Sequence, residues 1–358
     1  MVDKVLMKGN EAIGEAAIVA GCRHYFGYPI TPQTELTEYM AKRLPQVQGV
    51  FVQAESEVAA INMVYGAAGA GARTMTSSSG PGISLKQEGI SFIAGAELPC
   101  VIVNIMRGGP GLGGIQPSQA DYFQATKGGG HGDYHNIVFA PNSVQELVDI
   151  TILSFDMADK YRNPVMLLGD GALGQMMEPV VFSPSTAQAV EKPWAATGMR
   201  GRSSPNIINS LYLQPDLLER HNINLQKKYD LIAKQEVRYE SLYTEDAELI
   251  LVAYGITSRI ARSAMDKARA EGIKVGLFRP ISLWPFPSKA LSVLAGAAKV
   301  FLTIELSGGQ MVEDVRLAVL GSKPVYFYGR TGGNMPSTKE VYQKILEVMC
   351  REGGSYSG

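Results

Sequence analysis

Residues 50–77, VFVQAESEVAAINMVYGAAGAGARTMTS, hold the pattern that decides the fold of this chain. Val50–Gln53 and Arg73–Ser77 are short apolar runs typical of strands, and Ser56–Gly71 between them is Ala-rich and long enough for a helix. A strand, a helix and a strand in succession predict a βαβ unit with parallel strands. The helix is apolar almost all round, which predicts burial on several of its sides.

The same alternation continues on both sides of this segment. Helices are predicted near Gln33–Arg43 and at Val144–Ala158, and an earlier one is expected to start at an Asn10 cap and to end at Gly21. Further buried strands are predicted at His24–Tyr28, Cys100–Ile105, Asn136–Ala140 and Pro164–Leu168. Strands that alternate with helices in this way indicate a parallel sheet covered on both faces.

The character of the sequence changes between about Phe182 and Asp246, where a proline-interrupted stretch precedes a charged, helix-prone segment from Leu217 to Tyr243. The alternation then restarts and ends with a helix near Thr338–Arg351. We therefore predict an α/β protein with two doubly wound domains. The expected domains are residues 1–190 and 246–358, joined by a linker with a helix at 191–245.

Composition and charge narrow the classes of function. A chain of 358 residues, 46% hydrophobic and 19% charged, is expected to form more than one well-buried core. Its 33 Lys and Arg residues balance 34 Asp and Glu residues, so we expect neither nucleic acid nor a membrane as partner. The three cysteines, Cys22, Cys100 and Cys350, form no C-x-x-C motif for a zinc ion or an iron–sulfur cluster. Together with the lack of an apolar signal region, they favour a cytoplasmic location.

Three positions at predicted strand ends carry groups suited to a ligand, because open α/β sheets bind ligands at that edge. Thr31 lies in the segment Gly27–Pro32, Glu57 opens the apolar helix, and Arg107 follows the strand that begins at Cys100. Each position also has a purely structural interpretation. Thr31 could cap the next helix, Glu57 could be a favourable partner of the helix dipole, and Arg107 could pair with a structural acid rather than clamp a substrate carboxylate.

Three other segments resemble known motifs only in part. Gly109–Gly114 fits the dinucleotide-binding pattern G-x-G-x-x-G, but Gln-Pro-Ser follows where a helix should already run. His131 and His135 could bind a metal, although a flexible glycine tract is a poor setting for one. Gly169–Gly171, with Asp170, resembles the start of a motif that holds magnesium and diphosphate. The asparagine pair that this motif needs does not follow, so a strand-end turn is expected.

Six segments together resemble a known family. They are GYPITP at 27–32, QAESEVAA at 53–60, ARTMTSSSGPG at 72–82, GAELP at 95–99, RGGPGLGGIQPSQADY at 107–122 and GLFRPISLWPFP at 276–287. The sequence is similar in these segments to alpha subunits of 2-oxoacid:ferredoxin oxidoreductases. It resembles most the type that acts on branched-chain 2-oxoacids such as 2-oxoisovalerate (3-methyl-2-oxobutanoate). The likeness runs through both predicted domains.

This resemblance implies a pyrimidine-binding domain for thiamine diphosphate, followed by a domain like the C-terminal domain of transketolase. It implies oxidative decarboxylation of a 2-oxoacid to acyl-CoA and CO2, with coenzyme A and ferredoxin as substrates of the complex. A beta subunit would share the thiamine diphosphate, hold its magnesium ion and bear iron–sulfur clusters. Gamma and ferredoxin-like delta subunits would complete the complex. The resemblance places no metal in this chain, in agreement with its missing asparagine pair and cysteine motifs.

The family's site residues carry over by position. Glu57 matches the glutamate that hydrogen-bonds the aminopyrimidine ring of the cofactor, and the neighbouring segment with Pro29 and Ile30 matches further cofactor-binding positions. Thr31 and Arg107 match residues that orient the oxo and carboxylate groups of the substrate. The rival interpretations are the same enzyme type acting on 2-oxoglutarate, pyruvate or an aryl pyruvate, an unrelated dinucleotide-binding oxidoreductase, and a non-catalytic binding module.

Overall fold

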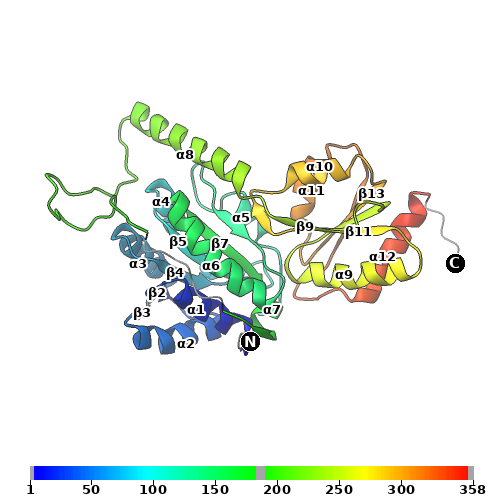
Figure 1. Ribbon diagram of the computed structural model, residues 1–358, viewed down its shortest axis with the longest axis horizontal. Coiled ribbons are helices and arrows are strands. Elements are labelled where there is room, and N and C mark those ends of the chain that lie inside the picture. Colours follow the sequence, from blue (N-terminus) through cyan, green and yellow to red (C-terminus); the bar gives the residue numbers. More distant parts are fainter. Residues whose placement is uncertain (1–3, 183–189, 354–358) are drawn as a thin grey trace.

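Two sheets lie side by side in the computed structural model of the chain, which describes residues 4–182 and 190–353 (Figure 1). One sheet has seven strands and the other has five. Helices pack on both faces of each of these two sheets. This arrangement confirms the predicted fold class of two doubly wound α/β units.

The seven-stranded sheet forms the core of the first unit. Its strands, in order across the sheet, are β12 (Ser282–Trp284), β6 (Ile137–Phe139), β7 (Pro164–Asp170), β5 (Cys100–Met106), β4 (Thr74–Ser78), β2 (His24–Gly27) and β3 (Val50–Gln53). All of them run parallel except β12, which pairs antiparallel with β6. The strand β12 comes late in the sequence, so the chain returns to the first sheet after it has started the second.

Right-handed crossovers decide which helices cover which face of this sheet. They place α1 (Gly9–Val19), α2 (Thr34–Arg43) and α6 (Val144–Tyr161) on one face and α3 (Glu57–Gly69) and α4 (Pro81–Gly95) on the other. Every residue of β5 and β7 is buried, because the two strands lie in the middle of the sheet with helices above and below. Parallel strands with continuous apolar sequences are typical of this position.

The five-stranded sheet is also mostly parallel and has helices on both faces. Its order is β14 (Val325–Gly329), β13 (Val300–Glu305), β10 (Leu249–Val252), β11 (Val275–Pro280) and β9 (Tyr239–Leu242), with only β9 antiparallel. On its faces lie α9 (Gly255–Ala270) with α12 (Thr338–Arg351), and α10 (Ser288–Leu294) with α11 (Met311–Val319). The remaining elements are β1 (Val5–Lys8), paired with β8 (Met177–Val180), η1 (Leu44–Val47), α5 (Tyr122–Thr126), α7 (Gly171–Gln175) and α8 (Pro215–Gln235).

Three local predictions need correction. Asn10 does not cap the first helix: it is buried in α1 and donates to the Pro32 carbonyl oxygen at 2.8 Å. The predicted linker helix ends at Gln235 instead of Tyr243, because the following residues pair with β11 as β9. The helix α3 is buried mainly where it faces the sheet and α4, and Val58 remains 41% exposed on its other side.

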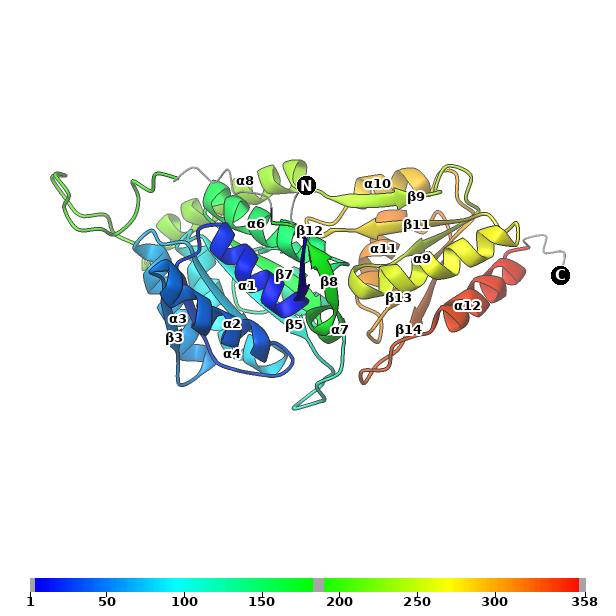
Figure 2. The ribbon, with the colours of Figure 1, turned by 60° about the horizontal axis from the view of Figure 1, so that its bottom comes forward.

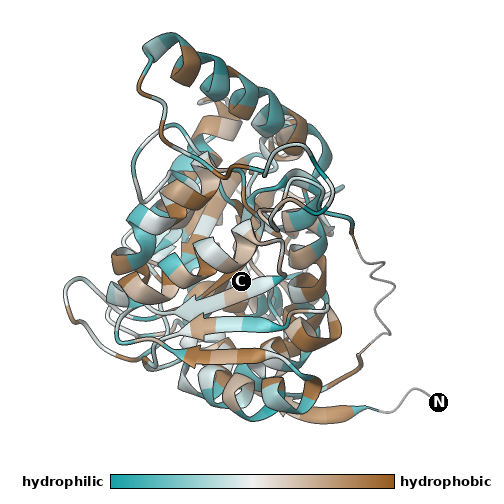
Figure 3. Ribbon diagram, turned by 90° about the vertical axis from the view of Figure 1, so that its left-hand side faces the viewer, coloured by the Kyte–Doolittle hydropathy of each residue, from teal (hydrophilic) through white to brown (hydrophobic). Residues whose placement is uncertain are grey.

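The helix α8 lies along the top of the molecule in Figure 1 and is mostly hydrophilic in Figure 3. Its buried residues are Leu225, Tyr229 and Ile232, which fall at helical spacing on one side. The segment is rich in charged residues because α8 packs on the first unit with only one narrow apolar side and exposes the rest of its surface.

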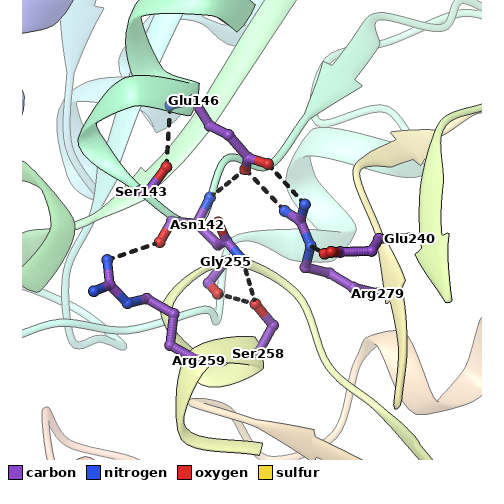
Figure 4. A network of polar contacts seen from close by, with 8 residues as sticks. All are labelled: Asn142, Ser143, Glu146, Glu240, Gly255, Ser258, Arg259 and Arg279. Atoms are coloured by element: carbon purple, nitrogen blue, oxygen red, sulfur yellow. Dashed lines mark hydrogen bonds and ion pairs between the residues drawn. The ribbon is translucent and has the colours of Figure 1, made fainter. Parts of the chain in front are cut away.

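An ion-pair network around the buried Arg279 joins the two units (Figure 4). The guanidinium group of Arg279 on β11 donates to both carboxylate oxygens of Glu146 on α6, at 2.7 and 2.8 Å, and to Glu240 on β9 at 2.8 Å. Asn142 donates to the Ser258 hydroxyl at 3.1 Å close by. Bidentate pairing of this kind fixes geometry as well as charge, so the network sets how the two sheets are oriented.

A second contact between the units is made by Gln119, which is buried in the loop between β5 and α5. Its Nε2 donates to the Tyr254 carbonyl oxygen at 2.8 Å, and its Oε1 accepts from the Leu306 amide at 3.0 Å and from the Thr257 hydroxyl at 3.2 Å. The long loop after β5 is thus anchored to the second unit.

Candidate active site

The carboxyl ends of β2, β3, β4 and β5 lie along one edge of the first sheet, because these neighbouring strands are parallel. Thr31 follows β2, Glu57 follows β3, and Arg107 follows β5. The segment Ser78–Gly82 connects the end of β4 to α4. It lies between Glu57 and Arg107. The sheet therefore brings together three residues that are far apart in the sequence.

Arg107 is held by main-chain carbonyl groups. Its side chain is 8% exposed, and it donates to the carbonyl oxygens of Thr31 at 2.9 Å and Leu112 at 3.1 Å. Within the described part of the chain, Arg107 forms no salt bridge with an acid. Its charge does act on the buried carboxyl group of Asp121: burial raises the pKa of Asp121, and the positive charge of Arg107 opposes this shift. A guanidinium group has five N–H donors, and these two bonds leave donors for a further acceptor.

Thr31 has an exposed side chain and does not cap a helix. The helix α2 starts at Thr34 with Gln33 before it, so the capping interpretation of Thr31 is wrong. Pro29 and Ile30 are half-buried in the same segment. The contact of Arg107 with the Thr31 carbonyl group shows that this segment and the β5 end form one site.

Glu57 is the first residue of α3 and is only 6% exposed. Its position is fixed by Ser56, whose hydroxyl group caps α3 by accepting from the Ala59 amide at 3.2 Å. The carboxyl group points to the start of α4, where a Cβ atom on Gly82 would lie 2.5 Å from Glu57 Oε1 and 2.1 Å from Ser78 Oγ. A side chain at position 82 would therefore displace the Glu57 carboxyl group or the Ser78 hydroxyl group.

Several buried polar atoms around these residues have no hydrogen-bond partner within the described chain. They are Ser78 Oγ, Ser79 Oγ and Arg107 Nε. Buried polar groups are nearly always hydrogen-bonded in a complete protein, so unsatisfied groups beside a buried carboxyl group indicate a place for a polar ligand.

Gln33 holds the Thr31 segment against the sheet, a role that the sequence alone did not reveal. Its Oε1 accepts from the hydroxyl groups of Ser77 at 2.5 Å and Thr37 at 3.1 Å, and its amide nitrogen Nε2 donates to the Tyr28 carbonyl oxygen at 3.3 Å. Gln33 is fully buried. A buried glutamine with satisfied bonds rigidifies the loop that contains it.

Lys86 is a second residue that the sequence did not single out. It is fully buried on α4 and donates to the Thr76 hydroxyl group at 2.5 Å and to the Ser77 carbonyl oxygen at 3.0 Å. Burial lowers the pKa of Lys86 to about 7, and the negative charge of Glu57 opposes this shift. A lone lysine at helical spacing gives no signal in sequence, because its burial depends on the neighbouring strand.

Lys86 makes the stability of the chain depend on pH. Its pKa is about 7 in the folded state against a usual 10.5, so the unfolded chain binds more protons between these two values. The cost of burying the ammonium group is fully present below about pH 7 and disappears as the pH rises towards about 10.5. We expect wild-type stability to rise with pH in this window, and Lys86→Met to remove that part of the rise.

Urea unfolding of the full chain at about pH 7 and pH 9 measures this difference. Lys299→Met is the control, since Lys299 is more than half exposed in its pair with Glu248. An equal gain between the two pH values in wild type and in Lys86→Met would contradict the prediction.

The three partial motifs have structural explanations. Gly109–Gly114 opens no helix, because α5 begins only at Tyr122, so the dinucleotide-binding pattern is not realised. The His135 ring stacks on Trp284 at 4.5 Å between ring centres, and no group of three possible metal ligands occurs in the described residues. Asp170 ends β7 and caps α7 by accepting from the Ala172 amide at 2.9 Å, as expected of a strand-end turn.

Comparison with known families agrees with this site. Residues 15–240 match the thiamine-diphosphate-binding domain of pyruvate flavodoxin/ferredoxin oxidoreductases, and residues 247–341 match core domain II of pyruvate:ferredoxin oxidoreductase. The chain belongs to the 2-oxoacid:ferredoxin oxidoreductase family. The first match covers every predicted site residue, and its description names thiamine diphosphate as the bound cofactor.

Individual members of the 2-oxoacid:ferredoxin oxidoreductase family show the same relationship. Ketoisovalerate oxidoreductase subunit VorB of Methanothermobacter marburgensis is 55% identical over 96% of this chain and 97% of its own length. The 2-oxoglutarate synthase subunit KorA of Methanocaldococcus jannaschii is 37% identical over 95% of this chain and 98% of its own length. These similarities confirm the family resemblance and favour the branched-chain type over the 2-oxoglutarate type.

A solved structure of the 2-oxoacid:ferredoxin oxidoreductase family has the same fold. The 2-oxoglutarate:ferredoxin oxidoreductase of Magnetococcus marinus, with 2-oxoglutarate, coenzyme A and succinyl-CoA bound, has a TM-score of 0.84 and 28% identity. The match covers 97% of this chain and 65% of that chain. In the chain described here, none of the described helices is both long and apolar enough to cross a membrane.

Proposed function

We propose that the chain is the pyrimidine-binding subunit of an oxidoreductase that converts 2-oxoisovalerate, or a related branched-chain 2-oxoacid, to acyl-CoA and CO2. Partner subunits pass the electrons to ferredoxin. The observation that carries this proposal is the site itself, in which a buried carboxyl group and a buried guanidinium group flank unsatisfied polar atoms at one sheet edge. The similarity to VorB supports the branched-chain substrate.

The residues of this chain divide the work between cofactor and substrate. Glu57 shares a proton with the ring nitrogen of the aminopyrimidine, and the Ser78 and Ser79 hydroxyl groups offer further hydrogen bonds. Pro29 and Ile30 line the cofactor side of the site. Thiamine diphosphate, when bound, supplies the carbanion that attacks the 2-oxo carbon.

Arg107 and Thr31 hold the substrate in this scheme. Arg107 binds the 2-oxoacid carboxylate with the donors that its bonds to Thr31 and Leu112 leave. Thr31 orients the oxo group with its exposed side chain. Holding the adjacent carboxylate and oxo groups of the acid aligns the 2-oxo carbon with the cofactor, and such positioning is a main contribution of the protein.

Exposed apolar residues around the site favour a partner subunit. Val58 is next to Glu57 and is 41% exposed, Leu85 on the neighbouring α4 is 51% exposed, and Leu112 near Arg107 is 82% exposed. Apolar residues gathered beside a polar site are typical of protein interfaces. We propose a beta subunit here that carries the diphosphate, the magnesium ion and iron–sulfur clusters, together with gamma and ferredoxin-like delta subunits.

Two further assignments complete the proposal. We assign residues 1–190 to the pyrimidine-binding domain, 191–245 to a linker and 246–358 to the second domain, with β12 as the strand that the second part returns to the first sheet. We place the complex in the cytoplasm, where the exposed thiol of Cys350 would stay reduced.

Purification of the native complex and assay of ferredoxin reduction over a panel of 2-oxoacids tests this function. We expect coenzyme A-dependent activity, highest with branched-chain acids, and a colourless, inactive chain after separation from its partners. Preference for 2-oxoglutarate or pyruvate would overturn the substrate assignment. Turnover by the separated chain, or stoichiometric iron bound to it, would overturn the proposed division of labour.

A further inference from the structure

The loop that follows Arg107 is closed on itself by main-chain bonds. The Gly108 amide donates to the Gln116 carbonyl oxygen at 3.0 Å, and the Gly114 amide donates to the Gly108 carbonyl oxygen at 2.9 Å. Leu112, near the tip of this loop, provides the carbonyl group that Arg107 contacts. The position of the guanidinium group therefore depends on the shape of the loop from 108 to 116.

A turn of the second unit packs against the base of this loop. Gly332 and Gly333 follow β14, and their backbone lies 3.6 Å from the place of a Cβ atom on Gly108. Both loops project at the lower edge of the molecule in Figure 2. This contact joins the second unit directly to the segment that holds Arg107.

Only glycine fits at position 333. Its φ is +87°, a value that favours glycine, and a Cβ atom there would lie 2.2 Å from Gln116 Cβ and 3.1 Å from Gln116 Cγ. Gly332 provides a comparison, because its φ of +66° is also positive but nothing lies within 4 Å of its added Cβ atom. Its backbone lies in the left-handed region that other residues occasionally adopt, so the contact with Gln116 is tested separately by changing Gln116 itself.

We propose that Gly333 is a positioning residue for substrate binding. The second unit sets the closed loop through the contact of Gly333 with Gln116, and the loop sets Arg107 through the Leu112 carbonyl group. This inference rests on the proposed role of Arg107 and adds a function for the second unit, which supplies none of the site residues predicted from the sequence. A side chain at position 333 pushes Gln116 away and moves the loop without touching the site itself.

The test is Gly333→Ala in the assembled complex, with Gly332→Ala as matched control. A shift of about an ångström at a binding group can cost about a hundredfold. We expect kcat/KM for every 2-oxoacid to fall about ten- to a hundredfold in Gly333→Ala, mainly through a higher KM. Exchange of the thiazolium proton without substrate should stay normal, because Glu57 belongs to a different part of the site. Gly332→Ala should keep most of the activity.

Gln116→Gly in the Gly333→Ala background provides a rescue. This second change removes the two closest atoms and leaves Gln116 Cα, which lies 3.4 Å from the added Cβ atom. We expect kcat/KM to return to that of Gln116→Gly alone. Equal losses in Gly332→Ala and Gly333→Ala, or a loss that Gln116→Gly does not rescue, would overturn the inference.

Arg107→Lys in the same complex distinguishes the proposed role of Arg107 from the positioning role of Gly333. Impaired Arg107→Lys with normal Gly333→Ala would overturn only the positioning role of Gly333. Normal kinetics in Arg107→Lys would overturn the proposed role of Arg107 and the present inference with it. Recovery of intact complex from each variant shows that the subunits still fold and assemble.

Discussion

Glu57→Gln is expected to slow exchange of the thiazolium proton in the assembled complex by about 10²–10⁴-fold, the usual cost of losing a positioned acid–base group. The Glu57 carboxyl group is buried at the first residue of α3 and points to Gly82, where an added Cβ atom would lie 2.5 Å from Glu57 Oε1. Glutamine keeps the size and hydrogen-bonding capacity of this residue but cannot share the proton with the pyrimidine nitrogen. Measurement of exchange with deuterium isolates this step from electron transfer.

Glu55→Gln is the internal control for this experiment. Glu55 lies two residues before Glu57, in the same strand-to-helix connection, but its side chain is exposed. We expect exchange in Glu55→Gln to stay close to the wild-type rate. Near-normal exchange in Glu57→Gln, or a heavier loss in Glu55→Gln, would show that the wrong carboxylate has been assigned.

Arg107→Lys is expected to lower kcat/KM about ten- to a hundredfold for every 2-oxoacid, which is the range for losing a hydrogen bond to a charged group. The guanidinium group of Arg107 can bind two main-chain carbonyl groups and a substrate carboxylate at once, because it has five donors in a planar fork. An ammonium group on a lysine stem is a point charge with three donors, so it cannot make the same set of bonds.

Arg316→Lys provides the same chemical change on the exposed side of α11. It should leave kcat/KM unchanged, since Arg316 lies outside the site. Thiazolium proton exchange should be normal in Arg107→Lys, in contrast to Glu57→Gln. Wild-type kinetics in Arg107→Lys would assign this residue a structural role only.

The sequence predicted most of the strands and both sheets because local periodicity reports which residues are buried. β5 and β7 are continuous apolar runs, and burial of every residue in these two strands explains why the pattern was clear. The parts that were wrong depend on partners elsewhere in the chain. Residues 239–242 pair with β11 instead of continuing α8, and Val58 is exposed because it lies on the side of α3 that faces neither the sheet nor α4.

The candidate site was predictable in its residue types but not in its contacts. The strand-end rule singled out Thr31, Glu57 and Arg107 as candidates but left a structural alternative open for each, and their roles were predicted from the family resemblance. Gln33 and Lys86 were missed because neither has a motif. Their importance follows from burial against Ser77 on β4, which no local pattern encodes.

The sequence by itself determined the family and the two α/β units, and it predicted the carboxylate and guanidinium groups of the candidate site. The tertiary structure alone decided that Arg107 donates to the carbonyl group of Thr31, 76 residues away, and that Gly333 of the second unit packs against Gln116. The physical reason is that the periodicity of apolar residues specifies which side of a strand or helix is buried. Which distant segment covers that side depends on the packing of the whole chain, where close main-chain contacts leave no hydrophobic signal in the sequence.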